Sequence, residues 1–354
     1  MAINLQYPIK ATYRNLIYRK DKHVAAYFRI PNTPITITDN DKKRKHKWTV
    51  SQLIKKLAKN QNFEISLIPK DYLLEEKMRD FMDALSPNNR KLGEDLLLHT
   101  VDTLTDEMEI PYQFDWLVGV RLRKHDKGSS LTDLAYERFS ELTETIANGL
   151  GFELEEEKPW YEDYLSDEQD CFQILSALRC RRLTNEELFY YQRMQYLRYI
   201  PHFKGEVLAN RSLFNVTDTL IKSLSGGFLK LESPYGTSFV TILPVGKFNT
   251  IFNGFHLGEF IQRLNFPVEL QIKAEFIDRN KIKGKMGRSN TRYRNSMEEA
   301  DSTNTVQQDE IIMGSFSLKD LMQKVGNKED IIEYGAYLIV SASSITQLRI
   351  RRQV

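Results

Sequence analysis

The stretch YQFDWLVGVRLR, residues 112–123, alternates almost without a break between two sets of side chains. Large apolar residues fill one set of positions: Tyr112, Phe114, Trp116, Val118, Val120 and Leu122. The other positions carry most of the polar residues, among them Asp115 and Arg121. A period of two predicts a β-strand with one face on a hydrophobic core. At about 3.3 Å per residue, such a strand can cross a small domain.

The sequence predicts the same order of strands and helices twice, once in the first third of the chain and once in the last third. In the first third, strands at 24–30 and 63–67 flank a helix whose apolar stripe is Val50, Leu53, Ile54 and Leu57. In the last third, a hairpin at 228–231 and 237–243 and a strand at 268–276 flank a helix with the stripe Leu257, Phe260, Ile261 and Leu264. A strand at 334–343 then corresponds to 112–123, and its apolar residues on both faces predict a central position.

This repeat predicts an α+β fold of two tandem split-βαβ (ferredoxin-like) lobes with an inserted helical segment. The first lobe is expected at 1–151, a helical connector at 152–225 and the second lobe at 226–354. Three smaller features are also predicted: a charged loop at 41–47, a short helix or turn at 218–224, and a break near 284–290 in a long helical segment.

Composition describes an ordinary globular protein. The 354 residues are 41% hydrophobic and 28% charged, and the net charge is +2, so an argument for nucleic acid has to rest on local clusters. Two cysteines, Cys171 and Cys180, favour a reducing compartment over a disulfide framework. No apolar run approaches the roughly 20 residues that span a bilayer, and the first residues lack the apolar segment of a signal peptide. A cytoplasmic location is expected.

The sequence holds no recognisable catalytic motif. A P-loop needs G-x-x-x-x-G-K-[ST], and the nearest stretch, around Gly246-Lys247-Phe248, lacks both the first glycine and the final hydroxyl. The six histidines are scattered, without metal-ligand spacing. We therefore predict no catalytic, cofactor-binding or metal-binding residue in this chain.

Asp115 admits two interpretations. A strand acid usually faces solvent. The alternative is a metal-dependent, palm-like enzyme centred on Asp115, in which paired carboxylates on a sheet hold two metal ions.

Two further clusters suggest surfaces for partners. The segment 281–294 is the most basic of the chain and would contact nucleic acid or lipid headgroups through Lys281, Lys283, Lys285, Arg288, Arg292 and Arg294. Its alternative is a mobile, solvated arm. An aromatic helix at 188–200 would dock a partner through Phe189, Tyr190, Tyr191, Tyr196 and Tyr199. Its alternative is a core helix.

Four stretches together resemble a known family. They are YPIKATYRNLIYRKDKHVAAYFRIP near the start, PYQFDWLVGVRLRK, GGFLKLESPYGTSFVTILPVGKF, and EYGAYLIVSASSITQLRIRRQ at the end. They are similar to the N-terminal half of the conjugation and type IV secretion ATPases (CagE/TrbE/VirB type), in the form found in Gram-positive conjugative elements. The resemblance covers essentially the whole chain and rests on no sharp catalytic motif.

The resemblance implies a non-catalytic docking and assembly region. In that family a RecA-like motor follows a helix such as the one that begins at Ser344, so ATP and Mg²⁺ are expected only in a motor domain beyond this chain. The absence of a stop signal after Ser344 agrees with a longer protein. The implied partners are membrane channel subunits of a conjugation apparatus and other protomers. The implied location is cytoplasmic, peripheral at the inner face of the cell membrane.

Overall fold

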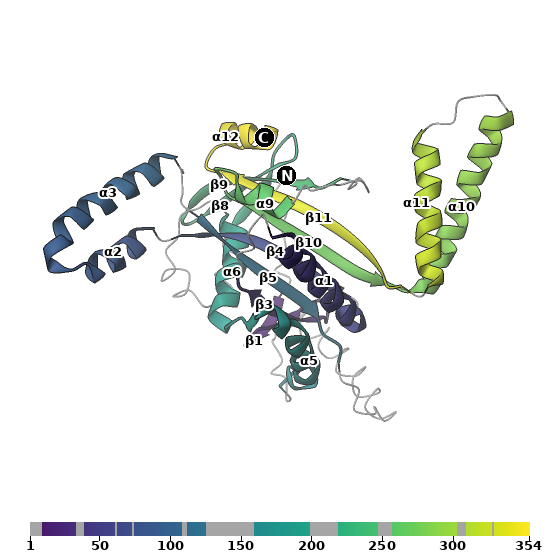
Figure 1. The fold of residues 1–354 in the computed structure, drawn as a ribbon, viewed down its shortest axis with the longest axis horizontal. Coiled ribbons are helices and arrows are strands. Elements are labelled where there is room, and N and C mark those ends of the chain that lie inside the picture. The colour runs from purple at the N-terminus through teal and green to yellow at the C-terminus, as the bar shows by residue number, and fades with distance from the viewer. Residues whose placement is uncertain are drawn as a thin grey trace, which may run out of the picture.

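The computed structural model describes residues 9–32, 39–60, 62–72, 74–107, 112–124, 159–198, 219–246, 257–302, 309–327 and 329–354. Within these ranges, eleven strands form one sheet in which all the neighbours pair antiparallel (Figure 1). The strand order is β1-β2-β3-β5-β4-β10-β11-β9-β8-β7, and β6 pairs with β3 off this path. The strands are β1 (Ile9–Tyr13), β2 (Leu16–Arg19), β3 (Val24–Ile30), β4 (Asn62–Asp71), β5 (Tyr112–Arg121), β6 (Arg181–Arg182), β7 (Leu220–Ser223), β8 (Phe228–Ser233), β9 (Gly236–Pro244), β10 (Val268–Ile277) and β11 (Ile331–Ala342).

Helices lie on both faces of the sheet and beyond its ends. Those described are α1 (Asn40–Lys56), α2 (Leu74–Ala84), α3 (Arg90–Glu107), α5 (Leu165–Leu175), α6 (Asn185–Leu197), α9 (Leu257–Gln262), α10 (Arg279–Ser302), α11 (Asp309–Gly326) and α12 (Ile345–Gln353). Short 3₁₀ turns occur at Leu57–Asn60, Pro87–Asn89, Glu162–Tyr164 and Ser176–Leu178.

The predicted division into two tandem ferredoxin-like lobes is wrong. Strands β4 and β10 pair antiparallel along their length, from Leu67 opposite Leu270 to Asn62 opposite Glu275, and so join the early and late strands into one sheet. Separate lobes would leave β4 and β10 as open edges with unpaired backbone groups. Periodicity identifies strands, but it does not reveal which edges pair across the chain.

The repeated order of elements is nevertheless visible in the sheet. On one side of the β4–β10 junction the order is β2-β3-β5-β4, and on the other it is β8-β9-β11-β10. The central position predicted for 334–343 is confirmed, because β11 lies between β9 and β10. The strand predicted at 112–123 is also central, since β5 lies between β3 and β4.

The core occupies both faces of the sheet. On one face, α5 and the stripe residues Leu53 and Leu57 cover β3, β4 and β5, while α9 and α12 cover the late strands through Ile261 and Leu348. On the other face, α6 and the segment before it pack on β2, β4 and β5 through Leu183 and Leu188. β5 is therefore buried on both faces, whereas its alternation predicted only one.

Several local predictions need correction. The charged stretch 41–47 forms the start of α1, because Asp39 caps the helix and accepts a hydrogen bond from the Lys42 N–H at 2.9 Å. Residues 220–223 form strand β7, and α10 continues through 284–290 without a break. Strands β1 and β2 were not predicted. The sequence also predicts a β arm at 35–38, a helix at 131–148 and a second break at 301–305. The first two and most of the third lie outside the described residues.

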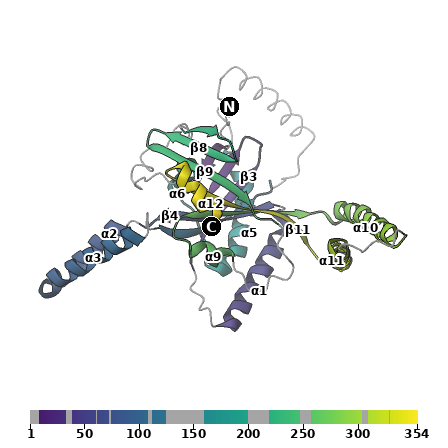
Figure 2. The same ribbon diagram turned by 90° about the horizontal axis from the view of Figure 1, so that it is seen from above.

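Two helical hairpins extend away from the sheet. The α2–α3 hairpin connects β4 to β5, and the α10–α11 hairpin connects β10 to β11. They project from opposite ends of the molecule in both views (Figures 1 and 2). This follows from the pairing, because antiparallel β4 and β10 place their carboxyl ends at opposite ends of the sheet.

Candidate functional site

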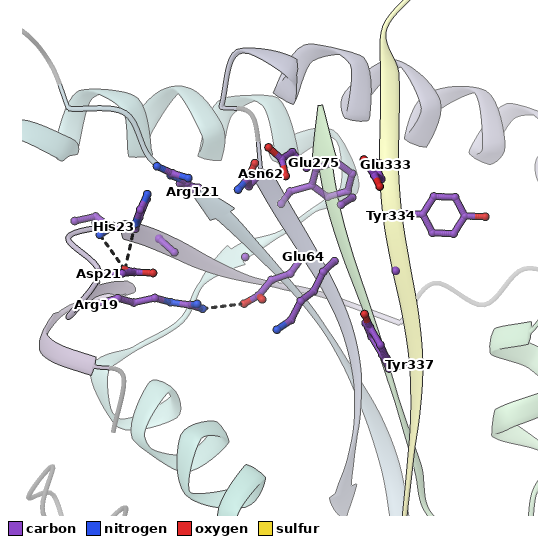
Figure 3. Close-up of a pocket in the computed structure, with 17 residues that line it drawn as sticks. Arg19, Asp21, His23, Asn62, Glu64, Arg121, Glu275, Glu333, Tyr334 and Tyr337 are labelled. Carbon is purple, nitrogen blue, oxygen red and sulfur yellow. Dashed lines mark hydrogen bonds and ion pairs between the residues drawn. The ribbon is translucent and has the colours of Figure 1, made fainter. Parts of the chain in front are cut away.

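An open pocket of about 490 Å³ lies on the part of the sheet that α6 leaves uncovered (Figure 3). Its walls come from the six strands β2, β3, β4, β5, β10 and β11 and from the β2–β3 turn, so its residues are widely separated in the sequence. The charged residues that line it are Arg19, Asp21, His23, Glu64, Arg121, Lys273, Glu275 and Glu333. Cations and carboxylates alternate around it, and Glu275 lies directly opposite Glu333 on the neighbouring strand. The pocket therefore carries no field of a single sign.

A hydrogen-bonded chain closes one side of this pocket. The Tyr27 hydroxyl donates to Glu64 Oε1 at 2.5 Å and accepts from Arg19 Nη2 at 3.0 Å. Burial, followed by the charge of Glu64, raises the pKa of Tyr27 well above its usual value, so the hydroxyl keeps its proton. A Cβ on Gly119 would lie 2.8 Å from both Glu64 Cγ and Tyr27 Cε1, so this chain crosses β5 where a side chain is missing.

Asp115 is not the exposed acid that its place in an alternating strand suggested. It is 2% exposed, forms an ion pair with Arg29, accepts a hydrogen bond from the Tyr191 hydroxyl at 2.5 Å, and lies 3.8 Å from Lys70 Nζ. These partners occupy the carboxylate and join α6 to the sheet. No group of three or more His, Cys, Asp or Glu residues in the described part of the chain could hold a metal ion.

The aromatic helix lies inside the molecule. Phe189, Tyr190 and Tyr191 of α6 are at most 8% exposed, Tyr196 is partly buried, and Tyr199 lies outside the described residues. The N-terminal capping box of α6, formed by Thr184 and Glu187, is confirmed. Tyr190 and Tyr191 pack between α6 and the sheet, and Phe189 is buried too, so the three rings offer no open surface to a partner.

The basic residues gather on α10. Lys281, Lys285, Arg288 and Arg292 recur at intervals of four, three and four residues, which places them in one stripe along the helix. We call these four residues the basic stripe. All four are exposed, and none of them forms an ion pair with the residues that the structure describes. Lys283 and Arg294 lie off the stripe, and Arg294 pairs with Glu298 at 3.4 Å.

Both projecting hairpins expose large apolar side chains. On α2 and α3 these are Phe81 (59% exposed), Leu92 (75%) and Leu96 (67%). Not one described side chain of α3 is buried. On α11, Phe316 is 65% exposed, while Gly314 lets the ring of Tyr293 on α10 come close, since a Cβ there would lie 2.7 Å from the Tyr293 hydroxyl oxygen.

No helix in the described part of the chain combines the length and the apolar character needed to cross a membrane.

Comparison with known proteins gives one informative match. No family model matches the sequence. A protein from Bacillus subtilis (strain 168) named "Uncharacterized protein YddE" is 22% identical over 336 residues, which are 93% of this chain and 40% of the relative. The chain therefore spans less than half the length of this relative.

Proposed function

We propose that this chain is the docking and assembly region of a conjugative-transfer (type IV secretion) ATPase. In this role it links a motor to the cytoplasmic face of a membrane channel, as a peripheral protein with channel subunits and other protomers as partners. ATP and Mg²⁺ belong to a motor domain outside this chain. The sequence resemblance supports the family, and the greater length of the B. subtilis relative agrees with a region that belongs to a larger protein.

The observation that carries the proposal is the pair of projecting hairpins. A helical hairpin that serves only stability buries its apolar residues against the fold. Here Leu92 and Leu96 recur four residues apart on α3 and stay exposed. Exposed apolar stripes of this kind mark surfaces for protein contact. The sheet between the hairpins gives both of them a rigid base.

The test is capture of membrane channel subunits encoded beside the gene of this protein. The 354-residue chain is immobilised and presented with detergent-solubilised subunits, and Leu92→Ser/Leu96→Ser is compared with the control Ile242→Ser, which changes an exposed apolar residue of β9. We expect the unaltered chain and the control to retain the subunits, and the α3 variant to lose them. Equal retention by all three, or ATP turnover by the purified chain, would refute the proposal.

A further inference from the structure

The two hairpins carry opposite charge. Between residues 74 and 107, nine acidic residues outnumber four basic ones. The acidic residues are Glu75, Glu76, Asp80, Asp83, Glu94, Asp95, Asp102, Asp106 and Glu107. The first half of α10 carries the basic stripe and, from Arg279 to Arg294, no acidic residue. The net charge of +2 thus hides a strong separation of charge between the two ends of the molecule.

Apolar side chains accompany the charges at both ends. Asp95 lies one helical turn from Leu92 on α3, and both side chains are exposed. On the other hairpin, Phe316 is exposed and the Lys319 ammonium lies 5.9 Å from the centre of its ring. Each end therefore presents exposed apolar side chains near charged ones, a combination that occurs in protein interfaces.

The two ends cannot meet within one molecule, because the hairpins project from opposite ends of the sheet (Figure 2). They can meet between two molecules. Contact between two different surfaces of identical chains is heterologous, and it continues from copy to copy until a ring closes or a filament grows.

We propose that copies of this chain associate head to tail, with the acidic α2–α3 hairpin of one copy against the basic stripe of α10 on the next. The inference rests on the proposed assembly role and deepens it by naming a second copy as the partner of the charged residues of both hairpins, whereas Leu92 and Leu96 contact the channel subunits. A second copy fits better than nucleic acid, because the chain itself carries an acidic, partly apolar surface that complements the stripe. Nucleic acid bound to the stripe would make no contact that explains the exposed Phe316 or the acidic hairpin.

The test is sedimentation velocity of the 354-residue chain over a range of concentrations at low and at high ionic strength. We expect concentration-dependent assembly that weakens at high salt, because exposed charges are screened. The variant K281Q/K285Q/R288Q/R292Q removes the stripe and should weaken assembly by about tenfold or more. The matched control R44Q/K45Q/K47Q/K56Q removes four exposed cations from α1 and should assemble like the unaltered chain.

A mixing experiment then separates this geometry from a symmetric one. The variant D80K/D83K/D95K/D102K reverses exposed acidic residues on the first hairpin and keeps the basic stripe. Each of the two variants alone should be monomeric. A mixture of the two should form dimers and nothing larger, because the intact acidic hairpin of the stripe variant can still contact the intact stripe of the other variant. Circular dichroism checks that every variant is folded.

Three results would overturn the inference: a monomeric chain at low salt, assembly that the stripe variant leaves unchanged, or mixtures that do not form dimers. If DNA or anionic vesicles bind the unaltered chain but not the stripe variant, while self-association is unaffected, the stripe serves nucleic acid or a membrane instead. Binding of channel subunits to the same variants, measured in parallel, shows whether the proposed docking role fails together with self-association or stands without it.

Discussion

Ile65 of β4 and Ile272 of β10 pair with each other across the junction of the sheet. They are also equivalent in the repeat, because the spacing from Leu57 to Phe63 equals that from Leu264 to Leu270. Around this pair the register is reciprocal: Phe63 faces Ala274, and Leu67 faces Leu270. The two halves of the sheet thus meet at equivalent strands running in opposite directions, and this arrangement sends the two hairpins to opposite ends.

Replacing Asp115 by Asn should destabilise the protein strongly. The change leaves Arg29, whose side chain is 28% exposed, without its buried carboxylate partner. We expect a loss of about 3 kcal/mol in the free energy of unfolding, measured by urea denaturation. Glu333→Gln, at an exposed position of β11, is the control, with a change within about 0.5 kcal/mol. Equal stability of the two variants would show that the Arg29–Asp115–Tyr191 network does not hold α6 on the sheet.

Gly119→Ala should also destabilise the fold. Its Cβ would lie 2.8 Å from Tyr27 Cε1, inside the chain that joins Tyr27 to Glu64. Overpacking of this kind costs about 1–3 kcal/mol, which the same denaturation experiment measures. The control is Gly246→Ala, because a Cβ there meets nothing within 4 Å. A neutral Gly119→Ala would mean that Tyr27 does not lie across β5 as described.

Stability should fall at alkaline pH. Burial, followed by the charge of Asp115, raises the pKa of Tyr191, and burial likewise raises the pKa of Tyr27. The folded state then holds these protons more tightly than the unfolded chain, whose tyrosines titrate near pH 10. The stabilisation that these two protonated tyrosines contribute is therefore complete below about pH 10. Above that pH the free energy of unfolding decreases by up to about 1.4 kcal/mol per pH unit for each tyrosine.

The variant Tyr191→Phe tests this assignment. The range from about pH 8 to about pH 11 spans the pKa of a free tyrosine. Over this range the free energy of unfolding of the variant should decline less steeply than that of the unaltered chain. Its stability at neutral pH should be lower by about 1 kcal/mol, because the hydrogen bond to Asp115 is lost. Parallel pH profiles for the two proteins would argue against a buried Tyr191 hydroxyl.

Sequence patterns predicted the strands better than their arrangement. The alternation in 112–123 predicts a strand, and the apolar residues on both faces of 334–343 predict a central one, because apolar positions on a pleated strand indicate which faces are buried. The stripes at 50–57 and 257–264 predict helices on the core, and Leu53, Leu57 and Ile261 are indeed buried. The pairing of β4 with β10 has no local signature in the sequence, because hydrogen bonds between distant strands are made by backbone groups that all residues share.

Charge was the less reliable guide. The run at 41–47 suggested a loop, yet a solvent-facing helix accepts such residues readily, and Asp39 supplies the cap. Asp115 looked exposed because an acid in an alternating strand usually is, and only its long-range partners, Arg29 and Tyr191, explain its burial. The pocket at Glu64 and Lys273 could not be predicted, because its residues come from strands far apart in the sequence.

The junction of the two halves can be tested directly with a double-cysteine variant. Ile65→Cys/Ile272→Cys places thiols on directly paired residues, whose Cα atoms lie within the roughly 4.4–6.8 Å that a disulfide spans. Ile65→Cys/Ala336→Cys is the control, because Ala336 pairs with Ile272 from the far side, about two strand spacings, or roughly 10 Å, from Ile65. Under mild oxidation, mass spectrometry should find the 65–272 disulfide and no 65–336 disulfide. Absence of the 65–272 link in the folded protein would contradict a single continuous sheet.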